Sequence, residues 1–433
     1  MEHQGVLNRT TLKPYGRSVS IIGVGCTPFM EILGSPETEG LTEGELFGYA
    51  AIEAMKDAGV QPKDIDYYFH GQANASFVSE YITPNMQVAN WFGMKGKGSM
   101  HHSEACCTGY LALEIAVMAV ASGKYDIVLT GAADMGASLP VDGQPAHKRR
   151  GFSLEEFNSS LKFIYDRAYT RGMQAGMYTV FDDLASLYAR DHQLDAKTMD
   201  EVLCAMAINN RYNASKNPLA KLQTTYDAIA KEKGFASAME FLQSPFNPKI
   251  GDYMRVSGLE ERSEGAAAII VCPTEMAYKY TDHPIEILGT GSSALEASNP
   301  HLERRATREA CRQVYEVTGV KPEEIDLFYA NDFIITSHLD AAEIAGYLPE
   351  NEGYQYVLDG RTRFDGDKPI NTNGGRTSFG HAHAASGLAD IYEAVKQMRG
   401  ECGERQVKQL PKTTMLRGFG GGQNVSATIL RNL

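Results

Sequence analysis

The sequence has no excess of basic charge and no long apolar run. Lysine and arginine total 41 and aspartate and glutamate total 54, so the formal net charge is −13. A surface of this sign repels polyanions, and we expect no nucleic-acid partner. No apolar stretch approaches the roughly 18 residues of a membrane-spanning helix, and the first residues, MEHQGVLNRTTLKPYG, lack the apolar core of a signal peptide. We therefore expect no membrane contact and a cytoplasmic location.

Metal-binding and disulfide patterns are also absent from the sequence. The seven cysteines are an odd number spread thinly along the chain, with no CxxC pair and no zinc-type spacing. We expect free thiols in a reducing compartment and no metal bound by this chain. The adjacent pair Cys106 and Cys107 is the exception that calls for a functional interpretation.

An internal duplication organises the chain. Its 433 residues exceed the roughly 250–300 that one hydrophobic core serves. Residues 51–70 (AIEAMKDAGVQPKDIDYYFH) and 311–330 (CRQVYEVTGVKPEEIDLFYA) each predict a helix closed by glycine, a proline turn and an apolar strand. Two structurally equivalent halves are the prediction. Five identities share an offset of 260 residues: Gly59, Val60, Pro62, Ile65 and Asp66 recur as Gly319, Val320, Pro322, Ile325 and Asp326.

Strand and helix patterns alternate in both halves. Apolar strands near residues 18 and 284 and helices over 106–123 and 383–400 predict βαβ units and mainly parallel sheets. The segment between the halves is rich in charge, Tyr and Met and reads as a helical insertion, after which a strand at 265–272 completes the first half. The predicted domains are 1–142 with 259–280, the insertion 143–258, and 281–433.

The two predicted helix starts carry reactive side chains. Cys106 and Cys107 begin the first helix, whose positive end should lower a thiol pKa and favour a thiolate nucleophile. His381 and His383 precede the matching helix, and equivalent helices of a duplicated fold can converge on one pocket. A thiolate beside an imidazole is an acyl-transfer pair. A buried cysteine pair at a helix cap is the alternative. Backbone amides of the glycine-rich segment 418–426 could form an oxyanion hole.

At these residues the sequence resembles the thiolase superfamily, near its sterol-carrier-type and archaeal branch, over almost the whole chain. CCTG matches the nucleophile motif and places the nucleophile at Cys106 rather than Cys107. GGRTSFGHAHAASG follows the GG-x4-GH-P-x-G-A-T-G motif, with His381 as its histidine. NRYNASKNPLA and SEGAAAIIV are similar to the loop-domain and Asp-Gly-Ala-Ala signatures. The resemblance implies an α/β fold of duplicated domains, layered α-β-α-β-α, with a helical loop-domain insertion.

The resemblance also implies further site residues. Asn331 falls where a thiolase asparagine holds a water in the first oxyanion hole, and Gly420 falls in the Cys-x-Gly turn that would supply a backbone amide. Coenzyme A is implied as a substrate bound at the loop domain, where HKRRG offers Lys148 and Arg149 to its phosphates. No bound cofactor and no metal are implied.

The sequence departs from the family pattern at the positions that would supply the acid and base for proton transfer. Thiolases usually use a second cysteine as acid and base at the substrate α-carbon, but the two positions that could hold it are Gly418 and Phe333. Ala382 replaces the motif's proline, and His383 becomes a candidate for the proton transfer. Relatives without this cysteine resemble subunits that work with a separate zinc-ribbon OB-fold protein, such as benzoylsuccinyl-CoA thiolase and phloroglucinol-type acetyltransferases. A homodimer core and a possible partner of that kind are the implied assembly.

The leading functional interpretation is an acyltransferase that cleaves or forms a 3-oxoacyl-CoA through an acyl-Cys106 intermediate. Its substrate could be an aromatic or branched ester such as benzoylsuccinyl-CoA. Three alternatives remain open at this stage. The chain could transfer an acyl group to a carbon nucleophile that is not a CoA ester. It could be a retro-aldolase of side-chain thioesters, or a non-catalytic subunit that binds acyl-CoA.

Overall fold

The computed structural model describes residues 10–30, 41, 43–73, 84–87, 89–134, 177–294, 300–421 and 424–433. Lys148 and Arg149, the predicted coenzyme A contacts, lie outside these ranges. Among the helices within them, none is both long and apolar enough to cross a membrane.

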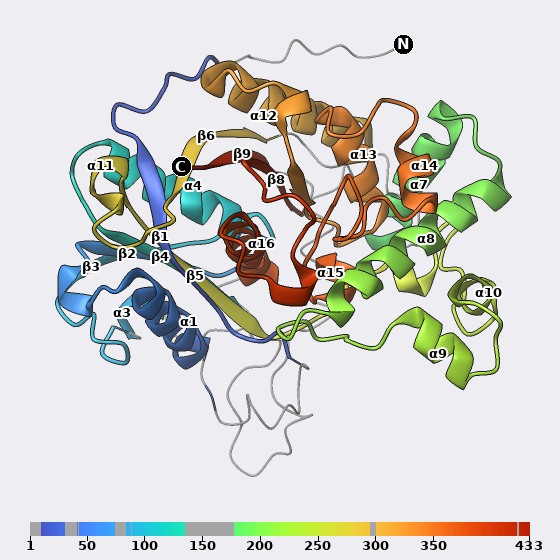
Figure 1. The fold of residues 1–433 in the computed structure, drawn as a ribbon, viewed down its shortest axis with the longest axis horizontal. Helices are drawn as coiled ribbons and strands as arrows, with labels where there is room; N and C mark the ends of the chain where they lie inside the picture. The colour runs from blue at the N-terminus through green and yellow to red at the C-terminus, as the bar shows by residue number, and fades with distance from the viewer. Residues whose placement is uncertain are drawn as a thin grey trace.

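The described strands form one nine-stranded sheet in the order β3-β2-β4-β5-β1-β6-β9-β8-β7 (Figure 1). The order is that of two similar halves meeting where β1 pairs with β6, and this confirms the predicted duplication. The strands are β1 Val19–Cys26, β2 Tyr67–Gly71, β3 Gly98–His102, β4 Val128–Asp134, β5 Gly265–Pro273, β6 Ile285–Ala294, β7 Leu327–Ala330, β8 Thr413–Gly420 and β9 Asn424–Asn432.

The expectation of mainly parallel sheets is wrong. Parallel pairing joins β2 to β3, β2 to β4 and β7 to β8, as βαβ connections require. The last strand of each half instead lies antiparallel to both of its neighbours. Strand β5 lies between β1 and β4, and strand β9 lies between β6 and β8. Both closing strands are largely buried, β5 as an apolar run and β9 with Ser426 and Thr428 between apolar residues. Buried strands occur in either pairing mode, so burial alone could not reveal their direction.

The repeated sequence motif forms the same local structure in both halves. Gly59 and Gly319 end their helices with φ of 65° and 69°, in the left-handed region that favours glycine. Oδ2 of Asp66 accepts hydrogen bonds from the backbone N of residues 126 and 127, at the start of β4. Oδ2 of Asp326 accepts the equivalent pair from residues 412 and 413, at the start of β8. Each aspartate therefore ties its own strand to the neighbouring parallel strand.

Helices form three layers around the two halves of the sheet. The outer layers are α1 (Glu43–Ala58) against β1, β4 and β5, and α12 (Pro300–Thr318) against β6 and β9. The central layer pairs α4 (Thr108–Ala121) with α16 (His383–Met398), and its core includes residues from both halves. A Cβ on Gly109 would lie 2.4 Å from O of Ala384. Glycine thus permits the close approach of the two helix starts.

Helices between β4 and β5 form a group on the right of Figure 1. This group packs against α12 to α15 of the second half. It corresponds to the described part of the predicted insertion, whose outer limits remain a prediction. The remaining helices are α3 Pro84–Gln87, α7 Met177–Asp191, α8 Ala196–Ser215, α9 Tyr226–Glu232, α10 Ala238–Gln243, α11 Thr274–Ala277, α13 Thr336–Ile344, α14 Gly353–Leu358 and α15 Gly375–Ser378.

Candidate active site

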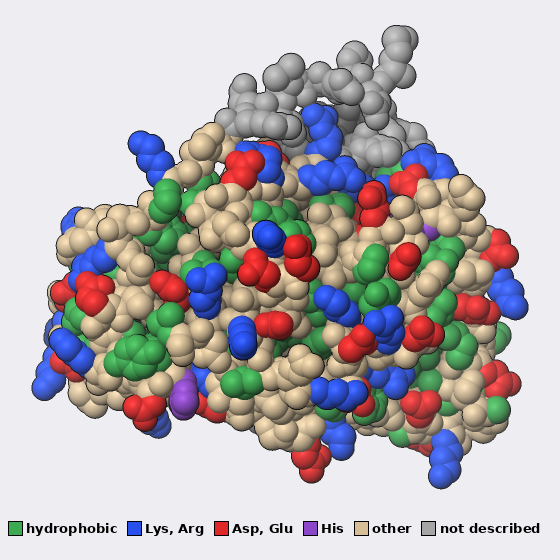
Figure 2. Space-filling view, turned by 45° about the horizontal axis from the view of Figure 1, so that its top comes forward, with side chains coloured by type: hydrophobic (Ala, Val, Ile, Leu, Met, Phe, Trp, Pro, Cys, Tyr) green, Lys and Arg blue, Asp and Glu red, His purple; other side chains and the backbone are tan. Residues whose placement is uncertain are grey.

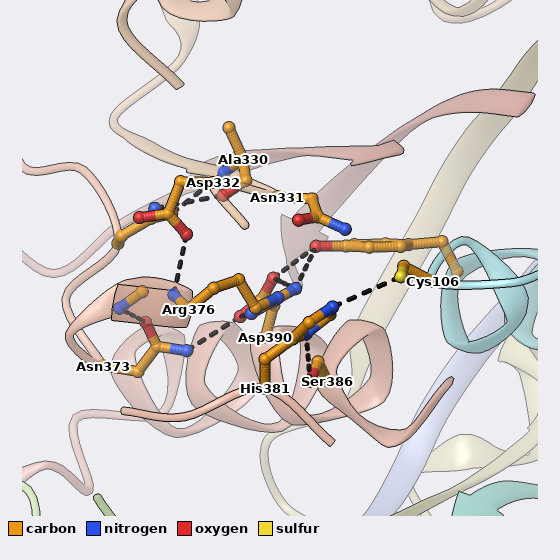
Figure 3. A network of polar contacts seen from close by, with 12 residues as sticks. Cys106, Ala330, Asn331, Asp332, Asn373, Arg376, His381, Ser386 and Asp390 are labelled. Carbon is orange, nitrogen blue, oxygen red and sulfur yellow. Dashed lines mark hydrogen bonds and ion pairs between the residues drawn. The ribbon is translucent and has the colours of Figure 1, made fainter. Parts of the chain in front are cut away.

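Cys106 and His381 meet at the starts of the two central helices (Figure 3). Sγ of Cys106 lies 3.2 Å from Nε2 of His381. Nδ1 of the same ring lies 3.1 Å from Oγ of Ser386 in the first turn of α16. The imidazole is fully buried and contacted at both nitrogens. A proton can therefore pass between the thiol and the ring without reorientation of the ring.

The two adjacent cysteines have different surroundings. Cys106 is partly exposed and lies two residues before α4, following Ala105, which has a left-handed φ of 49°. Cys107 is fully buried, and its Sγ lies 3.6 Å from Oγ of Ser426 on β9. Of the two thiols, Cys106 is therefore the one that combines access with an imidazole partner.

The surroundings of Cys106 favour the neutral thiol over the thiolate. Burial raises its pKa, and the negative charges of Glu260 and Asp134 raise it further. Burial also holds the pKa of His381 well below its usual value. The expectation that the helix end lowers the thiol pKa is wrong, because a helix dipole contributes only about 0.3–1 kcal/mol and acts within the first turn. These pKa directions favour a neutral thiol and a neutral imidazole before the substrate binds, with the thiolate forming as sulfur attacks the substrate.

Glu260 is a third member of this cluster. Its Oε2 lies 3.3 Å from Nε2 of His381, the nitrogen that also contacts Cys106. The Glu260 side chain is only 4% exposed. Burial raises the pKa of Glu260 to about 7, although the positive charges of Arg262 and Arg376 oppose the shift. A carboxyl group with this pKa exists in both protonation states near neutral pH.

Backbone hydrogen bonds hold Glu260 beside His381. Its segment enters β5 alongside the residues that precede α16. The N–H of His381 donates to O of Glu261 at 2.7 Å, and the N–H of Ser263 donates to O of His381 at 3.1 Å. Because these bonds are made by residues that closely follow Glu260 in the chain, they restrict where its carboxyl group can lie.

His383 adjoins the same cluster. Its ring centroid lies 5.0 Å from that of His381, and its φ of 22° is unusual for a residue other than glycine. Burial and the charge of Arg262 lower the pKa of His383 to about 4, so its ring is neutral at pH 7. Possible ligand atoms of Glu260, His381 and His383 lie within 4.8 Å of one another. We interpret the group as an acid–base cluster, since both His381 nitrogens already have partners.

The two residues predicted for oxyanion stabilisation lie around the end of β8. The side chain of Asn331 donates from Nδ2 to O of Phe419 at 2.7 Å and accepts at Oδ1 from N of Phe333 at 3.1 Å. Gly420 adjoins the turn that carries the nucleophile, because a Cβ there would come within 2.7 Å of N of Cys107. Their roles in stabilising an oxyanion remain predictions.

A buried ion pair between α15 and α16 lies beside the cluster and reaches α4 through Tyr110 (Figure 3). Nη1 and Nη2 of Arg376 donate to the two carboxylate oxygens of Asp390 on α16 at 2.9 and 2.7 Å. Nη2 also donates to the hydroxyl of Tyr110 on α4 at 3.1 Å, and Asn373 donates to Asp390 at 2.8 Å. Bidentate pairing of this kind fixes geometry as well as adding energy. The network therefore helps to hold the two helix starts in register.

Asp332, which follows Asn331 in the chain, takes part in a separate hydrogen-bond network. It accepts from N of Arg376 at 2.8 Å and from Nδ2 of Asn210 at 2.7 Å. Burial would raise its pKa, but the His338 contact and the other polar partners lower it overall. A carboxylate with these partners is held ionised, so it connects the insertion to the second half of the fold.

Glu260 and Arg376 are the site residues that sequence reasoning missed. Glu260 stands in LEERSEG, whose high density of charged residues is typical of a solvated loop, and Arg376 occupies a variable position of the glycine–histidine motif. The available signal for Glu260 was its position a few residues before an apolar strand of the first half. That signal does not distinguish an exposed acid from a buried one.

Comparison with known proteins agrees with this fold. The family model described as "Thiolase, N-terminal domain" matches residues 19–238, and "Thiolase C-terminal domain-like" matches residues 290–432. The acetyl-CoA acetyltransferase of Methanothermobacter thermautotrophicus is 30% identical over 411 residues, covering 94% of this chain and 97% of that protein. Subunit BbsB of the benzoylsuccinyl-CoA thiolase of Thauera aromatica is 26% identical and covers 94% and 95%.

A solved structure titled "Ltp2-ChsH2(DUF35) aldolase" has the same fold, with a TM-score of 0.74 at 20% identity over 97% of this chain and 99% of that one. The chain therefore belongs to the thiolase family. This membership confirms the predicted fold class and the predicted class of enzyme, an acyltransferase of the thiolase type that acts on acyl-CoA thioesters.

Proposed function

We propose that this protein cleaves or forms the carbon–carbon bond of a 3-oxoacyl-CoA through an acyl-Cys106 intermediate. The observation that carries the proposal is the 3.2 Å contact between Sγ of Cys106 and Nε2 of the buried His381. A thiol in contact with a general base is the arrangement that nucleophilic acyl transfer requires.

Cleavage begins when the thiol of Cys106 gives its proton to Nε2 of His381 while sulfur attacks the 3-oxo carbon. Because the resting thiol is neutral, proton transfer and attack proceed together. Backbone amides near Cys106 and Gly420 hold the oxyanion of the tetrahedral intermediate, at a position that Gly420's close approach favours. Asn331, through a water, and His381 stabilise the enolate oxygen of the departing thioester. Coenzyme A then takes the acyl group from Cys106.

Mass spectrometry of the intact protein tests this function directly. Incubation with acetyl-CoA and with 3-oxoacyl-CoAs of several chain types should add one acyl mass, which peptide mapping should locate on Cys106. A protein that binds these esters but acquires no acyl group on Cys106 would instead be a non-catalytic subunit, and one that cleaves a thioester without acylation would be an aldolase.

For the acyl group of the substrate, we propose only a chemical class. BbsB is named as a subunit of benzoylsuccinyl-CoA thiolase, and its 26% identity over most of this chain supports testing aromatic and branched 3-oxoacyl-CoAs. The aldolase alternative has less support, because the contact between the thiol of Cys106 and the imidazole of His381 favours acyl transfer. Transfer to a carbon nucleophile other than a CoA ester uses the same first half-reaction, and acceptor assays with the acyl-enzyme would separate the two.

Coenzyme A requires local positive charge on a chain of net charge −13. On the face drawn in Figure 2, basic and acidic side chains are interspersed. We propose that the basic run containing Lys148 and Arg149 contacts the phosphates. Changing both residues to glutamate should raise the KM for coenzyme A and leave kcat near its original value, because the phosphates lie far from the reacting carbon. Steady-state kinetics measure this, with Lys124→Glu and Lys197→Glu as charge-matched controls. An unchanged KM would place the phosphates elsewhere.

We propose a homodimer that pairs through the edge strand β3. This strand ends the sheet, and an open edge is a template for pairing with another chain. Met100 on β3 is 43% exposed, and Met86 on the adjacent helix α3 is 65% exposed. Apolar side chains beside an open strand edge support burial against a second copy.

The isolated chain is expected to be weakly active until a separate small subunit is added. Two relatives support this, since BbsB is a named subunit and the aldolase structure pairs Ltp2 with ChsH2(DUF35). We propose a zinc-ribbon OB-fold protein as the partner. Thiolysis rates of the chain alone and of the chain co-expressed with a co-purifying partner measure the effect, and light scattering gives the oligomeric state. Full turnover by a homodimer with no gain from a partner would contradict this expectation.

A further inference from the structure

Carbon–carbon cleavage leaves one proton unassigned. When the bond breaks, the departing thioester enolate must receive a proton at its α-carbon. The positions at which a second cysteine was expected are Gly418 and Phe333, neither of which can donate one. Phe333 instead presents an apolar ring whose centroid lies 6.5 Å from that of His381. Another acid must therefore serve this step.

We infer that the carboxyl group of Glu260 is this acid and, in the reverse direction, the base that removes the α-hydrogen. The inference rests on the proposed function and assigns a further catalytic residue to it. Oε2 of Glu260 lies 3.3 Å from Nε2 of His381, and Sγ of Cys106 lies 3.2 Å from the same nitrogen. The carboxyl group and the nucleophile thus flank one imidazole nitrogen. The α-carbon of a 3-oxoacyl-CoA is bonded directly to the carbon that Cys106 attacks, so it comes to the same place.

The environment of Glu260 suits a group that gives and regains a proton. Its side chain is buried, which excludes competing water, and its Oε1 lies 3.7 Å from Nε of Arg262. Burial raises the pKa of Glu260 to about 7 against the positive charges of Arg262 and Arg376. Rate is greatest when the pKa of a general acid or base is near the working pH.

His383 is the competing candidate. Its ring reaches the same cluster, but burial and the charge of Arg262 lower its pKa to about 4. At neutral pH it is a neutral imidazole with little capacity to deliver a proton as an acid. The carboxyl group of Glu260 is protonated in a substantial fraction of molecules at that pH.

The protons balance over one cycle. Cys106 gives its proton to His381, and the carbon–sulfur bond forms as the carbon–carbon bond breaks. Glu260 gives its proton to the α-carbon, which releases the shortened acyl-CoA. The carboxylate of Glu260 then takes the proton of coenzyme A, whose sulfur attacks the acyl-Cys106 thioester. The thiolate of Cys106 leaves and regains its proton from His381.

Two half-reactions separate this role from a positioning role. The first is exchange of the α-hydrogens of acetyl-CoA in deuterated buffer, followed by mass spectrometry of the recovered ester. The second is acetylation of Cys106 by the S-(4-nitrophenyl) ester of thioacetic acid, whose leaving thiol departs as an anion and needs no acid. Glu260→Gln should slow exchange about 10²–10⁴-fold and leave the acetylation rate within about threefold, an allowance below that range. Glu260→Asp should recover part of the exchange.

The control is Glu261→Gln, since that side chain is 37% exposed and paired with Lys221 at 2.7 Å. It should retain both half-reactions. Equal loss of both in Glu260→Gln, with unchanged thermal unfolding, would overturn the inference and make Glu260 a positioning residue. Loss of exchange in His383→Gln but not in Glu260→Gln would assign the proton to His383. A wild-type protein that is acetylated but does not exchange would also overturn it, whereas one that neither ester acylates on Cys106 would contradict the proposed function itself.

Discussion

Cys106→Ala should abolish acyl transfer without unfolding the protein. The thiol is the proposed nucleophile, and neither Glu260 nor the two histidines of the cluster can form a thioester. Alanine fits the position because the residue before it, Ala105, is already small and the thiol is partly exposed. Steady-state thiolysis and acyl-adduct mass spectrometry should both fall to background, while the thermal unfolding midpoint should remain close to that of the original protein.

Cys107→Ala is the matched control for this change. Its sulfur is buried against Ser426, so the change removes a small amount of packing and one weak hydrogen bond. We expect a modest loss of stability of about 1 kcal/mol and retention of most activity. If Cys107→Ala lost the acyl adduct and Cys106→Ala kept it, the assignment of the nucleophile would be wrong.

His381→Ala should lower the rates of acylation and of carbon–carbon cleavage together by about 10²–10⁴-fold. In the proposed mechanism the ring takes the thiol proton and also stabilises the enolate oxygen, so its loss affects both steps. Single-turnover measurements with a 3-oxoacyl-CoA resolve them.

A volume-conserving change is needed beside His381→Ala because the ring is fully buried. His381→Gln fills more of the space that alanine leaves and removes the base, so it should have a similar loss of rate with a smaller loss of stability. Activity of His381→Gln within about threefold of the original, well below the expected range, would remove His381 from the mechanism.

The meeting of Cys106 and His381 was predictable from the sequence because duplication converts local patterns into a spatial relation. Each half carries a small-residue helix start, and glycines at 109 and 387 mark the close approach of those helices. The sequence motifs around Cys106 and His381 therefore pointed to one pocket. The direction of β5 and β9 was not predictable, because a buried strand has the same apolar pattern in either direction.

The ionisation of the site also escaped sequence reasoning. A helix start indicates a lowered thiol pKa, but the structure places the partly exposed Cys106 with its sulfur enclosed beside Glu260, and this loss of solvation raises the pKa. Glu260 itself looks in the sequence like a solvated acid, and its pKa of about 7 arises because its backbone neighbours attach it to the His381 segment.

By itself, the sequence predicted the duplicated α/β architecture and the meeting of Cys106 with His381, because periodicity, helix ends and glycine positions are local properties that survive in the chain order. Tertiary structure alone decided which carboxyl group lies beside His381, that burial raises the pKa of both thiols, and how the two helices are held in register. These depend on desolvation and on contacts between segments that lie far apart in the chain, such as Glu260 with His381 and Arg376 with Tyr110. Burial and contact at such separations are set only when the layers pack.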